Sequence, residues 1–336
     1  LYWFGVRREE ALERVREGAR NSSYPKALLV AGEVPSQLKK GEYNFYQVTK
    51  SASHRLETAP TSKDDIAVWL FSGGTTGKPK AVPHMHHDGV IGCQSMHYNI
   101  HYAGDDIWIN APKLFFHYAH QLGMDWPFRF GASVVLFPER TTPQILFQLV
   151  EKHKCTMMIN VPTMMRAMIQ TPEQERRDLS SLRLCLSSGE ALSLQLHQEW
   201  MRTFGIEVID GIGSAETYLG YVYNRSGEVV PGSAGRVSAL VEAKIVDPEG
   251  REVPKGEIGV LMVRSDATGL YYHLLHEKSK QTFVGGDWVY TGDLFREDEK
   301  GNFWFAGRAN DMITVRGVWV SPMEIETRPR EHPAVR

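Results

Sequence analysis

The feature that most limits how this chain can fold is an alternation of short apolar segments with helical segments between residues 66 and 210. The apolar segments, which have the length and composition of buried strands, lie at 66–71, 133–137, 156–160, 182–186 and 206–209. The helical segments lie at 143–153, 163–170 and 193–204, and Thr142 is an expected N-cap. Alternation of this kind predicts a largely parallel sheet covered by helices.

The regions before and after this alternation have different patterns. Residues 6–20 are charged, with apolar side chains three positions apart, and predict a surface helix, whereas 26–65 are polar, turn-rich and without a strong period. After about residue 235, short strands at 241–246, 258–264, 288–291 and 303–305 are separated by turn sequences. The predicted fold class is therefore α/β, with helix-covered, largely parallel sheets followed by a β-rich, barrel-like subdomain.

Composition excludes several kinds of protein. Lys and Arg number 38 and Asp and Glu 40, for a net charge of −2, which does not suit a broad nucleic-acid-binding face. No apolar run approaches the ~18 residues of a membrane span, and the charged first ten residues do not resemble a signal peptide. The three cysteines are scattered. Because odd, scattered cysteines do not suggest a disulfide framework, we expect a cytoplasmic protein.

A segment rich in phosphate donors follows the first apolar strand. Residues 71–80 read FSGGTTGKPK, with three glycines, three hydroxyl side chains and two lysines. Glycines let backbone N–H groups face one point, and hydroxyl and ammonium groups add donors for phosphate oxygens. The segment is not a Walker A loop, because Ser72 and Pro79 stand where that motif needs Gly and Ser or Thr.

This segment resembles the phosphate-binding loop of AMP-forming acyl- and aryl-CoA ligases, adenylation domains and luciferases. Further motifs resemble that superfamily in the same order: the adenine-side loop at 187–192, the adenine and Mg²⁺ motif at 210–216, the Gly-Glu-x-Gly motif at 256–259, and the ribose motifs at 290–293 and 307–311. Within the superfamily, the segments at 111–118, 210–214 and 320–326 resemble benzoate–CoA ligases. The resemblance implies the fold of the large N-terminal domain of adenylate-forming enzymes.

The resemblance also implies site residues and the cofactors ATP or AMP, Mg²⁺ and coenzyme A. Thr75 and Glu216 are implied to be catalytic, with Glu216 also the Mg²⁺ ligand. The implied nucleotide-binding residues are Ser72, Gly73, Gly74, Thr76, Gly77, Lys78, Gly189, Glu190, Asp210, Gly211, Ile212, Gly213, Ser214, Asp293 and Arg308. The implied acid-binding residues are His117, Tyr118, Leu219 and Gly220.

Elementary chemistry supports these assignments. Adenylation brings a carboxylate to the α-phosphorus of ATP and expels pyrophosphate, so cations and N–H donors must neutralise the charge that builds up. Glu216 suits Mg²⁺, a hard cation that takes oxygen ligands, and Asp293 suits a pair of ribose hydroxyls. His117 is either a hydrogen-bond partner for a ring substituent or a packing residue, and the sequence does not separate the two. Gly220 suggests a pocket deeper than benzoate needs.

The resemblance predicts three parts. Residues 1–235 form an N-terminally incomplete α/β core, 236–307 a β-rich subdomain, and 308–336 a hinge and the start of a C-terminal domain. Only 336 − 308 = 28 residues follow Arg308, whereas a domain needs at least ~50. The family's lysine that contacts the carboxylate belongs to that domain, so we expect this chain to be a fragment. Asn310 replaces an Asp or Lys of the family at the hinge, and Thr314 a frequent Lys.

Three functions remain open from the sequence. The first is an AMP-forming aryl-acid–CoA ligase acting on benzoate or a related acid. The second is an adenylation domain that loads an acid onto a carrier protein, and the third is a truncated binding module without turnover. The expected partners are an aryl carboxylic acid and CoA, not nucleic acid or membrane, and a homodimer is left open.

Overall fold

The computed structural model describes residues 2–6, 9–21, 27–32, 34–73, 79–309, 313–315 and 318–320. Contacts divide the chain into two units, Leu1–Thr61 and Ser62–Arg336. The domain boundaries predicted after residues 235 and 307 stay predictions. None of the helices in these described stretches combines the length and apolar character needed to cross a membrane.

The first unit is a small parallel sheet with a helix packed on it. Its elements are β1 (Tyr2–Val6), α1 (Glu9–Arg20), β2 (Leu28–Gly32), β3 (Glu42–Asn44) and α2 (Phe45–Ser51), with strand order β1-β2-β3. Leu12 of α1 is buried with Leu28 and Val30. The predicted helix is confirmed from Glu9 onward, but the strands and α2 in the turn-rich region were not predicted. Three to seven residues are too few for a period to stand out.

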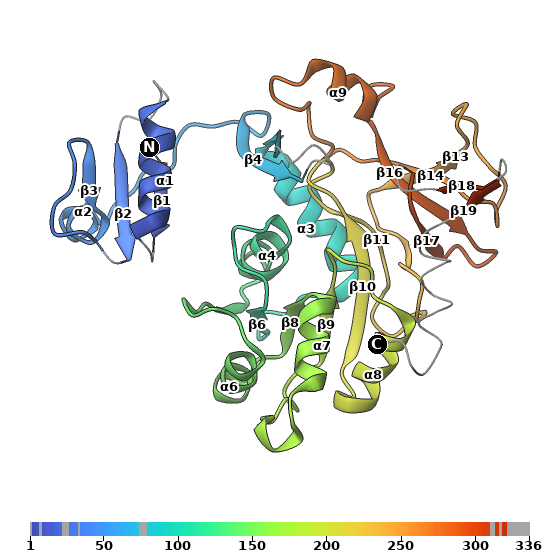
Figure 1. The fold of residues 1–336 in the computed structure, drawn as a ribbon, viewed down its shortest axis with the longest axis horizontal. Helices are drawn as coiled ribbons and strands as arrows, with labels where there is room; N and C mark the ends of the chain where they lie inside the picture. Colours follow the sequence, from blue (N-terminus) through green and yellow to red (C-terminus); the bar gives the residue numbers. More distant parts are fainter. Residues whose placement is uncertain are drawn as a thin grey trace. The chain divides into compact units, whose positions relative to one another are not determined.

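A seven-stranded sheet with the order β12-β11-β10-β9-β8-β6-β7 is central to the second unit (Figure 1). Its strands are β6 (Ile107–Asn110), β7 (Ser133–Val135), β8 (Met157–Asn160), β9 (Leu184–Ser187), β10 (Glu207–Gly213), β11 (Gly220–Tyr223) and β12 (Arg236–Val237). Strands β6 to β10 pair in parallel, and β11 and β12 add antiparallel pairs. The predicted parallel sheet is confirmed.

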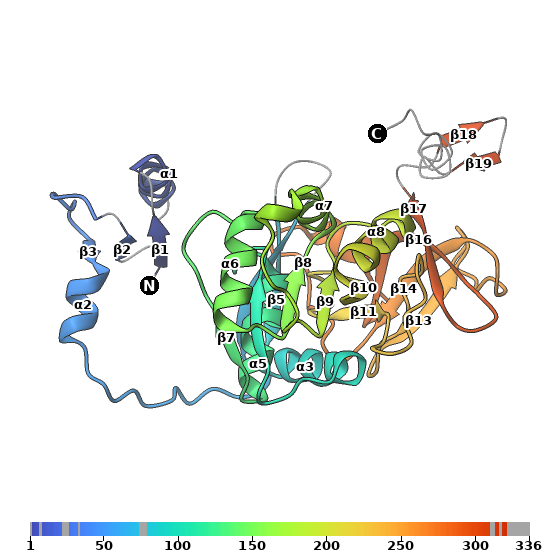
Figure 2. The same cartoon turned by 90° about the horizontal axis from the view of Figure 1, so that it is seen from below.

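Helices cover both faces of this sheet (Figure 2). They are α3 (His86–Ile100), α4 (His117–His120), the π-helical turn Gln121–Asp125, α5 (Trp126–Arg129), α6 (Pro143–His153), α7 (Pro162–Gln170), the 3-10 turn Glu173–Glu175 and α8 (Leu194–Phe204). Alternate strand residues face opposite layers. Met157 and Ile159 join the cluster that includes α3, whereas Met158 joins the cluster of α6, α7 and α8.

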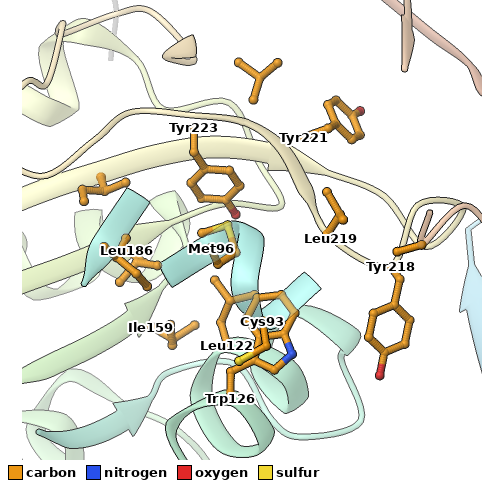
Figure 3. Close-up of a cluster of buried hydrophobic side chains, with 14 of the residues drawn as sticks. Cys93, Met96, Leu122, Trp126, Ile159, Leu186, Tyr218, Leu219, Tyr221 and Tyr223 are labelled. Carbon is orange, nitrogen blue, oxygen red and sulfur yellow. The ribbon is translucent and has the colours of Figure 1, made fainter. Parts of the chain in front are cut away.

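The cluster on the α3 side extends from the sheet to the residues after β10. Figure 3 shows Cys93 and Met96 of α3 beside Ile159 and Leu186 of the sheet, with Tyr223 above them. This packing holds β11 against the sheet, so the loop between β10 and β11 is anchored at both ends.

The predicted β-rich part is an antiparallel sheet. Its elements are β13 (Glu242–Val246), β14 (Gly259–Arg264), α9 (His276–Thr282), β15 (Phe283–Val284), β16 (Trp288–Glu297) and β17 (Phe303–Arg308). The strand order is β13-β14-β16-β15, and β17 also pairs with β16. Beyond it, β18 (Ile313–Val315) pairs antiparallel with β19 (Val318–Val320).

The first predicted strand of the alternation differs from expectation. It is β4 (Ile66–Ser72), and it pairs antiparallel with β5 (Lys80–Met85) instead of joining the parallel sheet. The prediction of a buried strand was wrong, because most of β4 is exposed and Leu70 is its buried side chain. The hairpin pairs Ser72 with Lys80, so the residues before and after the loop at 73–79 lie side by side.

Candidate active site

Polar side chains gather where the parallel strands end. Asn160 of β8, Ser187 of β9 and Asp210 of β10 are neighbours in register across the sheet. The carboxyl ends of strands are where open α/β sheets bind ligands. Burial raises the pKa of Asp210 to about 7, against the opposing effect of the Ser187 hydroxyl. The structure thus brings the predicted adenine-side loop and Asp210 to one edge of the sheet.

Glu216 lies in the loop after β10 and is 8% exposed. The hydroxyl of Tyr272 donates a hydrogen bond of 2.5 Å to Glu216 Oε1. Lys80 Nζ lies 3.8 Å from the same oxygen and donates to the Tyr272 hydroxyl at 2.9 Å. Burial pushes the pKa of Glu216 up, but the Tyr272 hydroxyl and the Lys80 charge, with help from Ser72, hold it below its ordinary value. The site therefore holds an ionised, buried carboxylate.

This carboxylate fits the predicted Mg²⁺ ligand. Mg²⁺ is usually held by one or two carboxylates together with substrate phosphates and waters. In the described part of the chain, no group of three or more His, Cys, Asp or Glu side chains forms a metal cage. A single ionised acid beside the phosphate loop thus suits a cation that arrives with a nucleotide, and Glu216 is the residue that would hold it.

Lys80 and Tyr272 are functional candidates that the sequence reasoning missed. Lys80 belongs to the phosphate-loop segment, whose lysine count was noted, but no role followed for this lysine. Tyr272 lies in none of the motifs and is 192 positions from Lys80. No local pattern in the sequence connects them to Glu216.

The remainder of the phosphate loop is only partly described. Ser72 is half-buried at the end of β4, and Gly73 follows it exposed. Gly74, Thr75, Thr76, Gly77 and Lys78 lie outside the described residues, as does Asn310.

The two ribose motifs meet across paired strands. Asp293 of β16 and Arg308 of β17 are register partners, and Arg308 Nε lies 2.9 Å from Asp293 Oδ1. Burial raises the pKa of Asp293 to about 6, while Arg308 and Tyr221 act against the rise. The charge of Glu216 raises the pKa of Asp293 further, so the two acids lie within electrostatic range. The structure therefore brings together the Glu216 motif and both ribose motifs.

The predicted acid-binding residues lie beside the same loop. His117 of α4 has its Nε2 3.3 Å from the carbonyl oxygen of Tyr218. Burial, followed by the nearby His84, lowers the pKa of His117 to about 3, so the ring is neutral at pH 7. Tyr118 Oη is buried without a hydrogen-bond partner in the described structure, and Leu219 is in the core.

The space that the sequence suggests at Gly220 is not empty. A Cβ atom there would lie 2.0 Å from Cε2 of Tyr223, so the tyrosine ring fills the position. The expectation of a deeper pocket at Gly220 was wrong for this reason. A Cβ at Gly211 would also meet the Tyr223 ring, at 2.3 Å, and one at Gly213 would lie 2.6 Å from the Leu219 carbonyl. These glycines allow β10 and β11 to approach closely.

The other predicted nucleotide-side residues have mostly structural contacts. Glu190 Oε2 accepts hydrogen bonds from Thr163 N and Oγ1, at 3.1 and 2.6 Å. Gly189, at φ +84°, has a backbone that L side chains rarely adopt. Ile212 packs on the core, and the Ser214 hydroxyl lies 3.5 Å from that of Thr217.

Comparisons with known proteins show the family of the chain. Residues 7–273 match the family model described as AMP-binding enzyme. The benzoate–CoA ligase of Thauera aromatica is 33% identical over 298 residues, which are 88% of this chain and 56% of that protein. The 4-hydroxybenzoate–CoA/benzoate–CoA ligase of Rhodopseudomonas palustris is 32% identical over 327 residues, 97% of this chain and 60% of that protein.

Solved structures give the same result. The chain is similar to the anthranilate CoA ligase AuaEII in complex with anthranoyl-AMP, with a TM-score of 0.91 and 35% identity, over 99% of this chain and 63% of that one. A benzoate CoA ligase from Burkholderia xenovorans matches with a TM-score of 0.84 and 29% identity, over 98% and 63%. The chain thus spans less than two thirds of the length of these relatives.

Proposed function

This chain belongs to the family of AMP-binding enzymes, and we propose that it is the nucleotide- and acid-binding part of an AMP-forming aryl-acid–CoA ligase. The observation that carries the proposal is the group made by Glu216, Lys80, Asp293 and Arg308. Lys80 lies 3.8 Å from Glu216 and Arg308 lies 2.9 Å from Asp293. Two acids and two cations from separate motifs are thus within electrostatic range of one another. The names of the relatives, which are ligases of benzoate, hydroxybenzoates and anthranilate, support an aryl acid as substrate and CoA as acceptor.

The proposed reaction has two steps. The carboxylate of the acid attacks the α-phosphorus of ATP, and pyrophosphate leaves with the electron pair of the broken P–O bond. The thiolate of CoA then attacks the acyl carbon, and AMP leaves, which gives the thioester. Mg²⁺, when bound, stabilises charge on the phosphate oxygens.

Each candidate site residue has a task in the proposed reaction. Thr75, Thr76, Gly77 and Lys78 bind the β- and γ-phosphates, and Glu216 holds the cation. Asp293 binds the ribose hydroxyls, and Arg308 binds the ribose or a phosphate. The residues at 189–190 and 210–214 bind the adenine. His117, Tyr118 and Leu219 contact the acid. The predicted cytoplasmic location and the homodimer alternative rest on the sequence and stay predictions.

Mass spectrometry tests the proposed function. The full-length protein is incubated with MgATP and benzoate, 4-hydroxybenzoate or anthranilate, with acetate as the comparison acid, and assayed for aryl-AMP and, after CoA addition, aryl-CoA. We expect an aryl acid to give acyl-AMP and acetate to give less. A protein that binds no ATP, or that activates acetate best, contradicts the proposal. Formation of aryl-AMP with transfer only to a carrier protein favours the adenylation-domain alternative.

A further inference from the structure

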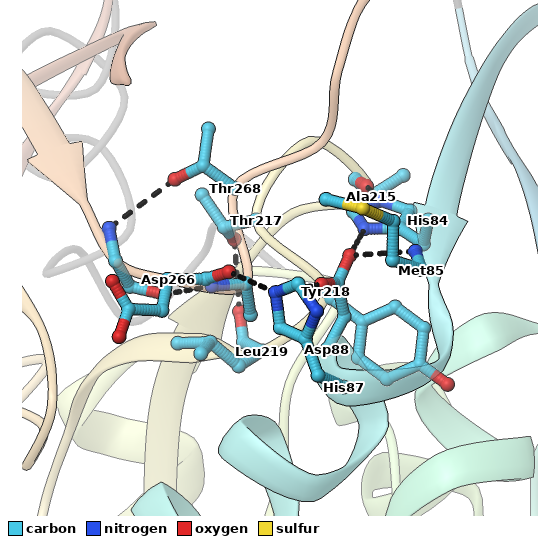
Figure 4. Close-up of polar contacts among 12 residues, drawn as sticks. His84, Met85, His87, Asp88, Ala215, Thr217, Tyr218, Leu219, Asp266 and Thr268 are labelled. Atoms are coloured by element: carbon cyan, nitrogen blue, oxygen red, sulfur yellow. Dashed lines mark hydrogen bonds and ion pairs between the residues drawn. The ribbon is translucent and has the colours of Figure 1, made fainter. Parts of the chain in front are cut away.

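The backbone that carries Glu216 is held by a buried histidine. His84 of β5 is 0% exposed, and its Nε2 lies 2.7 Å from the carbonyl oxygen of Ala215, the residue before Glu216 (Figure 4). Its Nδ1 lies 2.6 Å from Asp88 Oδ2. Because a carbonyl oxygen only accepts, Nε2 carries a hydrogen and donates a hydrogen bond to the Ala215 carbonyl oxygen. The ring therefore joins Asp88 to the loop of residues 214–219 between β10 and β11, the Glu216 loop.

Asp88 also reaches a second segment that supports Glu216. Its Oδ1 lies 3.1 Å from His87 Nε2, which is itself 3.0 Å from the carbonyl oxygen of Asp266 (Figure 4). Three positions later, Gly269 N donates to the Glu216 carbonyl oxygen at 2.8 Å. The Asp88 carboxylate thus bonds His84 through Oδ2 and lies beside His87, although its Oδ1 makes no hydrogen bond. Each histidine hydrogen-bonds the backbone of a segment that supports Glu216.

The Glu216 loop needs such external support. Tyr218, two residues after Glu216, has φ +62°, a left-handed conformation that is strained for a buried aromatic residue. Its ring lies 5.0 Å from the His84 ring, centroid to centroid. A strained conformation persists only where its surroundings hold it, and His84 contacts the loop through both a hydrogen bond and its ring.

We propose that His84 is a positioning residue for Glu216, acting through its Nε2–H bond to the Ala215 carbonyl and without touching the nucleotide. The proposal rests on the proposed function, in which Glu216 couples a divalent cation to ATP. The alternative is that His84 only stabilises the fold by pairing with the buried Asp88 carboxylate.

Two substitutions separate these roles. In His84→Asn the amide nitrogen lies where Nδ1 was, so it keeps the contact with Asp88 and loses Ala215. In His84→Gln the amide nitrogen reaches the place of Nε2, so it keeps Ala215 and leaves Asp88 without that partner. A purely structural histidine predicts that His84→Asn is the milder change in every property. If His84 positions Glu216, His84→Asn should be the more stable of the two variants but should have the smaller Mg²⁺-dependent gain in ATP affinity. His84→Gln should be less stable but keep more of that gain.

The test measures the affinity for ATP by calorimetry with and without MgCl₂, together with the melting temperature. We expect His84→Asn to melt near the wild type but to lose at least about fivefold of the Mg²⁺-dependent gain in ATP affinity, in the range of one lost hydrogen bond. We expect His84→Gln to melt lower but to lose less than about twofold of that gain. His97→Asn, near the other end of α3, is the control and should keep it.

The outcomes distinguish the inference from the function on which it rests. If His84→Asn keeps the full Mg²⁺ effect, the positioning role is wrong even if the protein is a ligase. This comparison needs only His84→Asn and the wild type, so it stands even if His84→Gln does not fold. If the wild type does not bind ATP, or Glu216→Gln keeps the Mg²⁺ effect, the proposed function of the site is wrong instead.

Discussion

Asp293 should reduce the stability of the protein in exchange for nucleotide binding. The residue is 3% exposed, and burial raises its pKa from 3.8 to about 6. A rise of the pKa from 3.8 to about 6 corresponds to about 3 kcal/mol that ionisation costs the folded state. The sign follows from the raised pKa: the favourable contribution of the protonated acid is complete below pH 3.8 and is lost as the pH rises through about 6.

The substitution Asp293→Asn removes this cost. The amide stays neutral at every pH, and the lost ion pair is worth only about 0–1 kcal/mol because Arg308 is 58% exposed. We expect the variant to be more stable than the wild type by about 1–3 kcal/mol at pH 8 and by about 1 kcal/mol or less at pH 4.5. Its affinity for ATP should fall roughly ten- to a hundredfold, since a charged hydrogen-bond partner of the ribose is lost.

Urea unfolding at pH 4.5, 6 and 8, followed by tryptophan fluorescence, measures the stability difference. Asp287→Asn, an exposed acid in the same part of the chain, is the control and should show no such pH dependence. A variant that is less stable at pH 8, or a difference that does not change with pH, would refute the reasoning. In that case Asp293 is held ionised by the fold and stabilises it.

Three further substitutions test other parts of the site. Tyr272→Phe removes the hydrogen bond to Glu216, and we expect about a tenfold loss of MgATP affinity by calorimetry. Gly220→Ala forces a Cβ against the Tyr223 ring, and we expect a loss of about 1–3 kcal/mol of stability in urea melts, with the ranking of acids by kcat/KM unchanged. His117→Phe removes a neutral ring whose Nε2 faces a carbonyl. With Nε2 facing that carbonyl, only Nδ1 is left to accept a hydrogen bond from the OH or NH₂ substituent of an acid. We therefore expect the kcat/KM of the full-length protein to fall more for 4-hydroxybenzoate and anthranilate than for benzoate.

Each of these changes has a control or a contradicting result. Tyr271→Phe changes a tyrosine that is 40% exposed and should leave MgATP affinity as it is. Gly18→Ala adds a Cβ that meets no atom within 4 Å and should be neutral or stabilising in its helix. Equal losses for all three acids in His117→Phe would indicate that His117 is a packing residue, the alternative that the sequence left open.

The elements with a strong period were predictable from the sequence. The helices α6 and α8 begin where Thr142 and Ser193 accept hydrogen bonds from backbone N–H groups, as capping residues do. The parallel sheet follows from strands that alternate with helices. The strands of the first unit are only three to five residues long, and β4 is apolar but exposed, so local pattern did not indicate them correctly.

The sequence motifs indicated Glu216, Asp293 and Arg308 as candidate site residues. They did not indicate the residues that contact the Glu216 loop. Lys80 and Tyr272 are 192 positions apart, and His84 and Ala215 are 131 apart. Such contacts exist only once the hairpin, the sheet and the β-rich part have packed, so no spacing in the sequence records them. Gly220 shows the same limit, because a missing side chain does not reveal that the Tyr223 ring takes its place.

In the proposed function, the group made by Glu216, Lys80, Asp293 and Arg308 binds an adenosine nucleotide, and Asp293 holds its ribose. Calorimetric titration of AMP and of 2′,3′-dideoxy-AMP into the wild type and Asp293→Ala tests it most directly. We predict saturable binding of AMP to the wild type and a roughly ten- to a hundredfold weaker affinity for the dideoxy nucleotide. In Asp293→Ala the two nucleotides should bind equally weakly, because the hydroxyls and the carboxylate are partners. No binding of AMP, or an unchanged preference for AMP in the variant, would contradict the claim.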